Sequence, residues 1–311
     1  MLKTALFSLS NRRYLILKRS FMTSLLLSLV LSLLSHQTAS ANAENSDSPS
    51  IPSAQRIISL APHITEMLYS AGAGNKIVGV VNYSDYPNDA LTKPIIGGYN
   101  AINLEKVIEL NPDLILGWES GNRLQDMKRL KELGFKLSVF EVKTLDDIPD
   151  RIEQLGVALG SANQAKQKAS ELRNTLKTLR QVYQSRVPVS SFYQIWHKPL
   201  ITMNGDQFIS QAMDICGAKN VFSDLPKLTA KIGLESLFQR DPQLFLIGGE
   251  ASFQQDWLKT WQGYPNLKAI KNNQIYLLNN SHYQRPTARL INHLEDLCLK
   301  VDQARIFYQK Q

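Results

Sequence analysis

Short apolar runs alternate with amphipathic segments along most of the chain. Between residues 56 and 140, four apolar runs predict buried strands: Arg56–Leu60, Ile77–Val81, Asp113–Gly117 and Lys136–Phe140. Residues with helical spacing lie between them, in three segments: Ile64–Ala71, Leu104–Leu110 and Leu124–Leu133. Because strands that alternate with helices pair in parallel and carry the helices on their faces, we expect a largely parallel sheet.

The middle of the chain has a different pattern. Asp146–Leu159 is amphipathic, and the chain from Ala162 to about Ser185 contains no Gly or Pro and is rich in Lys, Gln, Leu and Ala. We expect one helix of about 24 residues there, roughly 36 Å long, with Ser161 as its N-cap. A helix of this length is suited to join two lobes, and a solvated helix on a single large domain is the alternative.

The strand–helix alternation resumes after Pro188. The expected elements are Val189–Trp196, Phe208–Cys216, Leu234–Arg240, Gln243–Ile247, Asp256–Trp261, Ile275–Leu278 and a final helix from about Pro286 to Phe307. The predicted fold class is α/β, with two Rossmann-like lobes joined by a long rigid α-helix. The lobes are expected at residues 56–160 and 188–311, and the linking helix at residues 161–187.

Two segments 130 residues apart resemble each other. Ile102–Gly117 reads INLEKVIELNPDLILG and Ile232–Ile247 reads IGLESLFQRDPQLFLI, so each is a short helix, an Asn/Asp-Pro break and an apolar strand. Two lobes built to one plan explain this most simply, and chance similarity is the alternative. Glu105 and Glu235 lie in the first turns of the paired helices. They either complement the helix dipoles or offer one carboxylate per lobe to a two-fold symmetric partner.

The basic residues are concentrated at the amino terminus. The 311 residues include 35 Lys+Arg and 27 Asp+Glu, a net charge of +8, which alone would suggest a nucleic-acid or membrane partner. Residues 1–41 hold five of the basic residues and no acidic one, which leaves 30 against 27, a net charge of +3, for the remainder. The charge therefore gives no support for a nucleic-acid partner.

Residues 1–41 follow the pattern of a secretory signal peptide. Basic residues precede an apolar run at Leu25–Leu34, and Ala39-Ser40-Ala41 offers a cleavage site. The run is short for a bilayer span, and a retained membrane anchor is the alternative. Residues 42–55 are expected to form a flexible leader because most of them are small or polar. We therefore expect a soluble periplasmic protein of a Gram-negative bacterium.

The sequence lacks the common signatures of enzymes and metal sites. It contains no G-x-S-x-G, Walker A or G-x-G-x-x-G motif, and its histidines lack metal-ligand spacing. We therefore predict neither catalysis nor a metal site. Cys216 and Cys298, the only cysteines, form a disulfide or remain buried thiols, and export to an oxidising compartment favours the bond.

Aromatic residues gather just after the predicted strands. Ligands of open parallel sheets bind beyond the carboxyl ends of the strands, so these side chains are expected to line a cleft for a large flat ligand. Ordinary packing explains any single one of them equally well. The residues are Tyr83, Tyr86, Tyr99, Trp118, Trp196 and Tyr283.

Three sequence segments carry a family resemblance: LAPHITEMLYSAGAGNKIVGVVNYSDYP, NLEKVIELNPDLILGW and MDICGAKNVF. Through them the chain resembles, over about residues 55–300, the family of periplasmic vitamin B12 (cobalamin)-binding proteins, the substrate-binding components of cobalamin ABC importers. NYSDYP and the cysteine pair are specific to this family. The N-x-E and N-P-D-L-I sequences are shared with iron-siderophore and haem binders, which are the alternative, and a periplasmic enzyme is a more distant one.

The resemblance implies a monomer that carries cobalamin as a transported ligand, with no catalytic cofactor, to the permease dimer of the importer. Glu105 and Glu235 would dock to the permease, and Cys216 would be bonded to Cys298. The departures from the family pattern are Tyr99, where tryptophan is typical, and Ser281-His282, where an acidic residue and tryptophan are typical. Cobalt ligation by His63 or His282 stays open. The expected ligand contacts are Tyr83, Tyr99, Trp118, Trp196, Ser281, His282, Tyr283, Gln284 and Arg285.

Overall fold

The computed structural model describes residues 54–98 and 101–310, all within one compact unit of residues 51–311. The predicted signal peptide and the predicted leader up to residue 53 lie outside the described residues. The predicted end of the leader is wrong, because Ala54 is buried and the backbone amide of Gln55 donates to the carboxylate of Asp113 at 2.8 Å. Residues 54 and 55 therefore belong to the packed chain.

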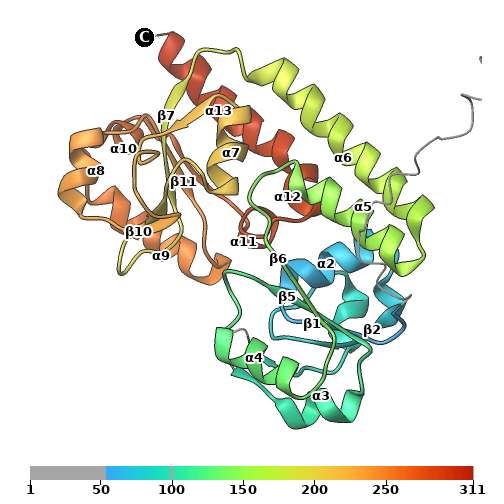
Figure 1. Cartoon of the computed structure of the whole chain (residues 1–311). Helices are drawn as coiled ribbons and strands as arrows, with labels where there is room; N and C mark the ends of the chain where they lie inside the picture. Colours follow the sequence, from blue (N-terminus) through green and yellow to red (C-terminus); the bar gives the residue numbers. More distant parts are fainter. Residues whose placement is uncertain (1–53, 99–100, 311) are drawn as a thin grey trace, which may run out of the picture. The chain divides into compact units, whose positions relative to one another are not determined.

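Four parallel strands form the first sheet in the order β2-β1-β5-β6 (Figure 1). They are β1 (Ile57–Ser59), β2 (Ile77–Val80), β5 (Leu114–Trp118) and β6 (Leu137–Phe140). The helices are α2 (Pro62–Ser70), α3 (Leu104–Leu110), α4 (Leu124–Glu132) and α5 (Asp147–Leu159). Successive side chains of a strand point to opposite faces, so Ile57 packs with α2 and α5 while Ile58 packs with α3 and α4.

Smaller elements complete this part of the chain. Two 3₁₀ turns occupy Gly74–Lys76 and Asn88–Thr92, and β3 (Gly97–Gly98) pairs antiparallel with β4 (Ala101–Ile102).

Helix α2 begins two residues before the predicted Ile64, because proline is well tolerated in the first turn of a helix and Pro62 occupies that turn.

The second sheet is also parallel, in the order β12-β11-β7-β9. Its strands are β7 (Val189–Gln194), β9 (Ala218–Asn220), β11 (Leu244–Ile247) and β12 (Ile275–Leu277), and β8 (Ile201–Met203) pairs antiparallel with β10 (Thr229–Lys231). The helices are α7 (Phe208–Ile215), α8 (Leu234–Arg240), α9 (Ala251–Gln262), α10 (Lys268–Lys271), α11 (Asn280–Tyr283), α12 (Ala288–Asn292) and α13 (Leu294–Gln309). The predicted fold class is confirmed, although the three-residue strands β8, β9 and β10 were not predicted.

The two repeated segments have the same local structure. Helices α3 and α8 have seven residues each, and each ends at a residue in the left-handed conformation, Asn111 (φ 42°) or Asp241 (φ 36°). Asn and Asp tolerate this conformation better than most residues, and the following proline cannot continue a helix. The helix–turn–strand unit predicted for both segments is therefore present.

The long helix α6 (Ala162–Tyr183) has 22 residues and is about 33 Å long. It packs closely on α5, because a Cβ added at Gly156 would come within 2.0 Å of the Cβ of Ala165. Ser161 occupies the N-cap position, but its hydroxyl donates to the Ala71 carbonyl at 2.5 Å instead of accepting from the helix. Helix α6 ends at Tyr183, four residues before the end that the sequence predicted for the linking helix. The domain boundaries expected from the sequence remain predictions.

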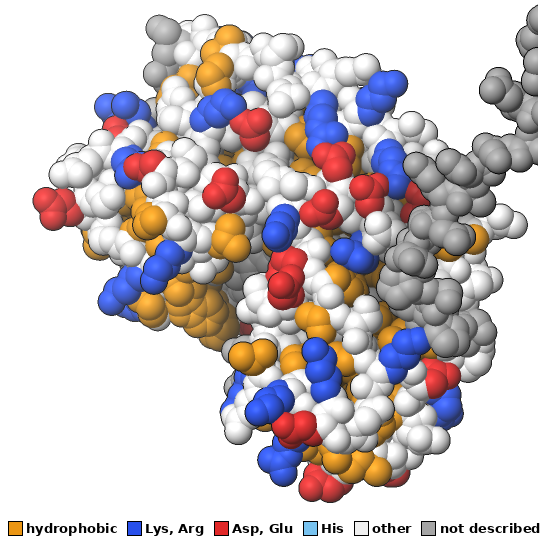
Figure 2. Space-filling model, viewed as in Figure 1, with side chains coloured by type: hydrophobic (Ala, Val, Ile, Leu, Met, Phe, Trp, Pro, Cys, Tyr) orange, Lys and Arg blue, Asp and Glu red, His pale blue; other side chains and the backbone are white. Residues whose placement is uncertain are grey.

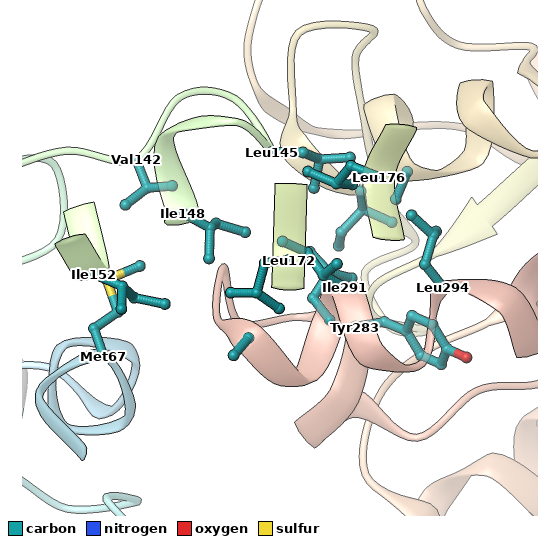
Figure 3. Close-up of a cluster of buried hydrophobic side chains, with 14 of the residues drawn as sticks. Met67, Val142, Leu145, Ile148, Ile152, Leu172, Leu176, Tyr283, Ile291 and Leu294 are labelled. Carbon is teal, nitrogen blue, oxygen red and sulfur yellow. The ribbon is translucent and has the colours of Figure 1, made fainter. Parts of the chain in front are cut away.

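The buried face of α6 joins the core on both sides. Its buried residues recur every three or four positions, which keeps them on one face: Ala165, Ala169, Leu172, Leu176, Leu179 and Tyr183. Figure 3 shows Leu172 between Ile148 of α5 and Ile291 of α12. One continuous apolar cluster thus includes residues from both sheets and from α6.

The end of the chain differs from the single helix predicted from Pro286 to Phe307. Helices α12 and α13 meet at His293, which has a φ of −98° and a ψ of 4°. The hydroxyl of Tyr283 donates to the carbonyl of His293 at 2.9 Å, and this contact with a residue ten positions away stabilises the break.

The disulfide between Cys216 and Cys298 is confirmed. Over the described ranges, no helix has the length and apolar character needed to cross a bilayer.

Candidate functional site

The predicted contact residues follow the carboxyl ends of strands in both parallel sheets. In the first sheet, β2 leads to Tyr83 and β5 ends at Trp118. In the second sheet, β7 leads to Trp196, and β12 leads to residues 280–285, which we call the 280–285 segment. This is the sheet edge at which open α/β folds bind ligands.

Polar and aromatic contacts hold Trp118 in place. Its indole N–H donates to the Glu141 carboxylate at 2.9 Å, and the same carboxylate accepts from the Ser120 amide at 3.0 Å. Burial raises the pKa of Glu141, but the hydrogen bonds from Ser120 and Trp118 lower it by a larger amount. The pKa of Glu141 is therefore below its ordinary value. The carboxylate is therefore ionised at neutral pH and orients the indole.

His63 lies against Trp118, with the ring centroids 5.0 Å apart and an interplanar angle of 86°. The residue is 5% exposed. Burial lowers its pKa to about 4, an effect that the negative charge of Glu141 opposes and the positive charge of Arg285 reinforces. The imidazole is therefore neutral at pH 7. In the ranges 54–98 and 101–310, no group of three or more His, Cys, Asp or Glu side chains could hold a metal ion.

Trp196 belongs to a cluster of aromatic side chains at the end of β7. Its ring centroid lies 5.9 Å from Phe253 and 5.5 Å from Trp257, both in α9, and His197 stacks on Trp257. Trp196 and Phe253 are 39% and 43% exposed, and Figure 2 shows apolar side chains gathered over the region of α9 beside a hollow. The cluster offers a broad apolar face to a ligand.

Sequence reasoning did not assign Phe253 and Trp257 to the site. Trp257 and Trp261 are four residues apart in α9, a spacing that also marks the buried face of a helix. Only the packing of α9 against the end of β7 shows that this helix also extends the exposed aromatic face.

Tyr83 is 68% exposed and has a φ of 67°. This left-handed conformation is uncommon for a residue with a bulky side chain, and such residues occur often at functional sites. Its exposed ring is available to a ligand. Tyr99 lies outside the described residues, so its expected contact stays a prediction.

The 280–285 segment begins with the short helix α11 rather than an open loop. The Asn279 side chain caps this helix by accepting from the Ser281 amide at 2.9 Å. The His282 ring stacks on His293 with centroids 3.6 Å apart, and burial lowers the pKa of His282, as do the neighbouring His293 and Arg289. His282 is half-buried and faces the junction of α12 and α13.

The remaining residues of the 280–285 segment differ in accessibility. Tyr283 is 2% exposed and belongs to the core, so the structure does not present its ring to a ligand. Gln284 lies at the end of β11, where a Cβ added at Gly248 would come within 2.6 Å of its Nε2 atom. Arg285 donates through Nη1 to Asp85 at 2.6 Å and to Glu66 at 3.1 Å. Its predicted bond to a ligand therefore competes with two carboxylates.

Glu105 and Glu235 are exposed in the first turns of α3 and α8. Neither carboxylate has a hydrogen-bond or ion-pair partner in the part of the chain that the structure describes. Both carboxylates are therefore accessible to a partner.

A cavity of about 390 Å³ lies elsewhere, along α6 and α7. Its lining includes Arg180 and Lys219, which pair with Asp146 and Asp214. None of the predicted contact residues that the structure describes lines this cavity. Because its charged side chains are already paired with each other or with neighbours, we do not assign it to the candidate site.

Comparison with known proteins confirms the family expected from the sequence. Residues 57–281 match the family model described as periplasmic binding protein. The vitamin B12-binding protein of Vibrio cholerae serotype O1 is 36% identical over 252 residues, which make up 80% of this chain and 91% of that protein. The vitamin B12-binding protein of Vibrio parahaemolyticus is 33% identical over 244 residues, or 78% of this chain and 88% of that protein.

Solved structures agree with this assignment. The crystal structure of the periplasmic vitamin B12 binding protein BtuF of Vibrio cholerae matches with a TM-score of 0.75 at 35% identity, over 81% of this chain and 98% of that chain. The periplasmic heme-binding protein RhuT from Roseiflexus matches with a TM-score of 0.71 at 20% identity, over 80% and 98% of the two chains, which shows a shared fold alone. The chain belongs to the periplasmic binding protein family.

Proposed function

We propose that this protein captures cobalamin or a related corrinoid in the periplasm and delivers it to an ABC importer of the inner membrane. The observation that carries the proposal is the placement of Trp118 and of the Trp196–Phe253 face at the carboxyl ends of two parallel sheets. Two aromatic surfaces on one chain suit a large flat ligand. The similarity to vitamin B12-binding proteins favours a corrinoid among such ligands.

The proposed binding makes and breaks no covalent bond. Aromatic faces supply apolar contact with the corrin ring, and Gln284 and backbone groups supply hydrogen bonds to its amide side chains. The carboxylate of Glu141 keeps the Trp118 indole in one orientation, which lowers the entropy lost when a ligand binds. Residues 1–41 act as a cleaved export signal, and the protein works as a monomer.

Delivery requires a surface that the importer recognises. We propose that Glu105 and Glu235 form ion pairs with basic residues of the permease dimer, one carboxylate for each subunit. Their equivalent positions in the two repeated helix–turn–strand units and their exposure support this role.

Ligand selectivity tests the proposal. The mature protein, purified from the periplasm of an expressing bacterium, is titrated with cyanocobalamin, haem and ferric siderophores while tryptophan fluorescence is followed. We expect the tightest binding for cyanocobalamin, and an affinity about tenfold lower or worse in Trp118→Ala, because large aromatic side chains dominate such contacts. Leu124→Ala is the matched control, since Leu124 is 84% exposed and lies on α4. Tighter binding of haem or of a ferric siderophore would contradict the proposal.

A further inference from the structure

A buried carboxylate in α2 binds two arginines that lie more than 200 residues further along the chain. Glu66 is 3% exposed. Its Oε2 atom accepts from Arg289 Nε at 2.9 Å, and its Oε1 atom accepts from Nη2 of Arg289 and, at 3.1 Å, from Nη1 of Arg285. A buried carboxylate is stable only when it is paired and hydrogen-bonded, and the two arginines supply the charge and the donors that Glu66 requires.

Asp85 and Tyr86 contact the same two arginines. Asp85 accepts from Arg285 through both carboxylate oxygens, at 2.6 and 3.3 Å. The guanidinium carbon of Arg289 lies 4.1 Å from the centroid of the Tyr86 ring, in cation–π geometry. We call these five residues the Glu66 cluster. It contains two carboxylates and two guanidinium groups, so its charges balance.

The Glu66 cluster connects two parts of the candidate site. Asp85 and Tyr86 belong to the NYSDYP sequence at residues 82–87, which also carries the exposed ring of Tyr83. Arg285 ends the 280–285 segment, directly after Gln284. The ion pairs therefore fix a segment that follows the first sheet against a segment that follows the second sheet.

We propose that Glu66 and Asp85 are positioning residues that hold Arg285, and with it the 280–285 segment, against residues 82–87 before a ligand arrives. The inference deepens the proposed function and rests on it: Arg285 serves the site through the Glu66 cluster and does not donate to the ligand itself. Fixing both segments in advance reduces the ordering cost of binding.

A double-mutant cycle separates this role from direct contact. Arg285→Gln breaks the contacts of Arg285 with both Asp85 and Glu66, and it is expected to weaken cyanocobalamin binding about tenfold. Asp85→Asn breaks only one of these contacts and is expected to weaken binding by a smaller factor, and the double variant should bind no more weakly than Arg285→Gln alone. Asp85 is preferred to Glu66 for substitution, since 44% of its side chain is exposed and its loss leaves Glu66 paired with Arg289. Unchanged or tighter binding in Asp85→Asn, the result expected if Asp85 only competes with the ligand for Arg285, would overturn the proposal, as would a double variant that binds more weakly than Arg285→Gln alone.

The pair formed by Arg240 and Asp224 provides the matched control. Both side chains are partly exposed, and Arg240 Nη1 lies 2.7 Å from Asp224 Oδ1. Neither residue belongs to residues 82–87 or to the 280–285 segment. Asp224→Asn is expected to leave cyanocobalamin affinity unchanged. A loss as large as that in Asp85→Asn would mean that any broken surface ion pair has this effect, which would also overturn the proposal.

Hydrogen exchange in the ligand-free protein gives a readout that does not need cobalamin. Amides of residues 280–285 are expected to exchange about tenfold faster in Asp85→Asn than in the wild type, and at the wild-type rate in Asp224→Asn. Unchanged exchange in Asp85→Asn would overturn the proposal. Faster exchange in a protein that fails to bind cobalamin would reject the proposed function and leave the positioning role of Asp85 standing.

Discussion

His63 should make the stability of the folded chain depend on pH in a way that a single substitution removes. The buried imidazole has a pKa of about 4, whereas an exposed histidine has its ordinary value of 6.5. Between these values the unfolded chain binds a proton that the folded chain does not, so the free energy of unfolding falls as the pH falls below 6.5. The contribution is fully present above that pH. Between pH 7 and pH 5 the loss from this residue is about 2 kcal/mol.

His63→Phe tests this magnitude, because phenylalanine keeps an aromatic ring against Trp118 but cannot be protonated. Urea unfolding of the wild type and the variant at pH 7 and pH 5 gives the four free energies needed. The wild type should lose about 2 kcal/mol more than the variant between the two pH values. Equal losses in the two proteins would refute the reasoning, since they would show that His63 titrates alike in the folded and unfolded states.

Two further predictions concern the disulfide and the docking surface. Replacing Cys216 and Cys298 together by alanine should lower the free energy of unfolding by about 4 kcal/mol, because the bond closes a loop of 82 residues; an unchanged urea midpoint would contradict this. Glu105→Ala combined with Glu235→Ala should impair cobalamin uptake by cells and leave ligand affinity unchanged, since both carboxylates are exposed in first helical turns. Unaltered uptake would assign both residues to the helix-dipole role.

The features predicted well from the sequence are those that local patterns determine. Apolar runs located the longer strands, and the Asn/Asp-Pro breaks located the ends of α3 and α8, because these signals act over a few residues. The expected export and an even number of cysteines favoured the bond between Cys216 and Cys298 over two buried thiols. In each case no knowledge of distant contacts was required.

The features that the sequence did not reveal depend on contacts between distant residues. The break at His293 is stabilised by the hydroxyl of Tyr283, and the sequence around it contains no Gly or Pro to signal it. Arg285 was expected to bind a ligand, since nothing in the sequence indicates that Glu66 and Asp85, about 200 positions away, lie beside it. Tyr283 was expected in the cleft because it follows a strand, but its ring completes the core.

An equilibrium titration of the purified protein with cyanocobalamin tests the central claim most directly. We expect saturable binding of one corrinoid per chain, with a dissociation constant in the micromolar range or below. Absence of saturation at micromolar concentrations of cyanocobalamin, in a protein shown to be folded, would contradict the account.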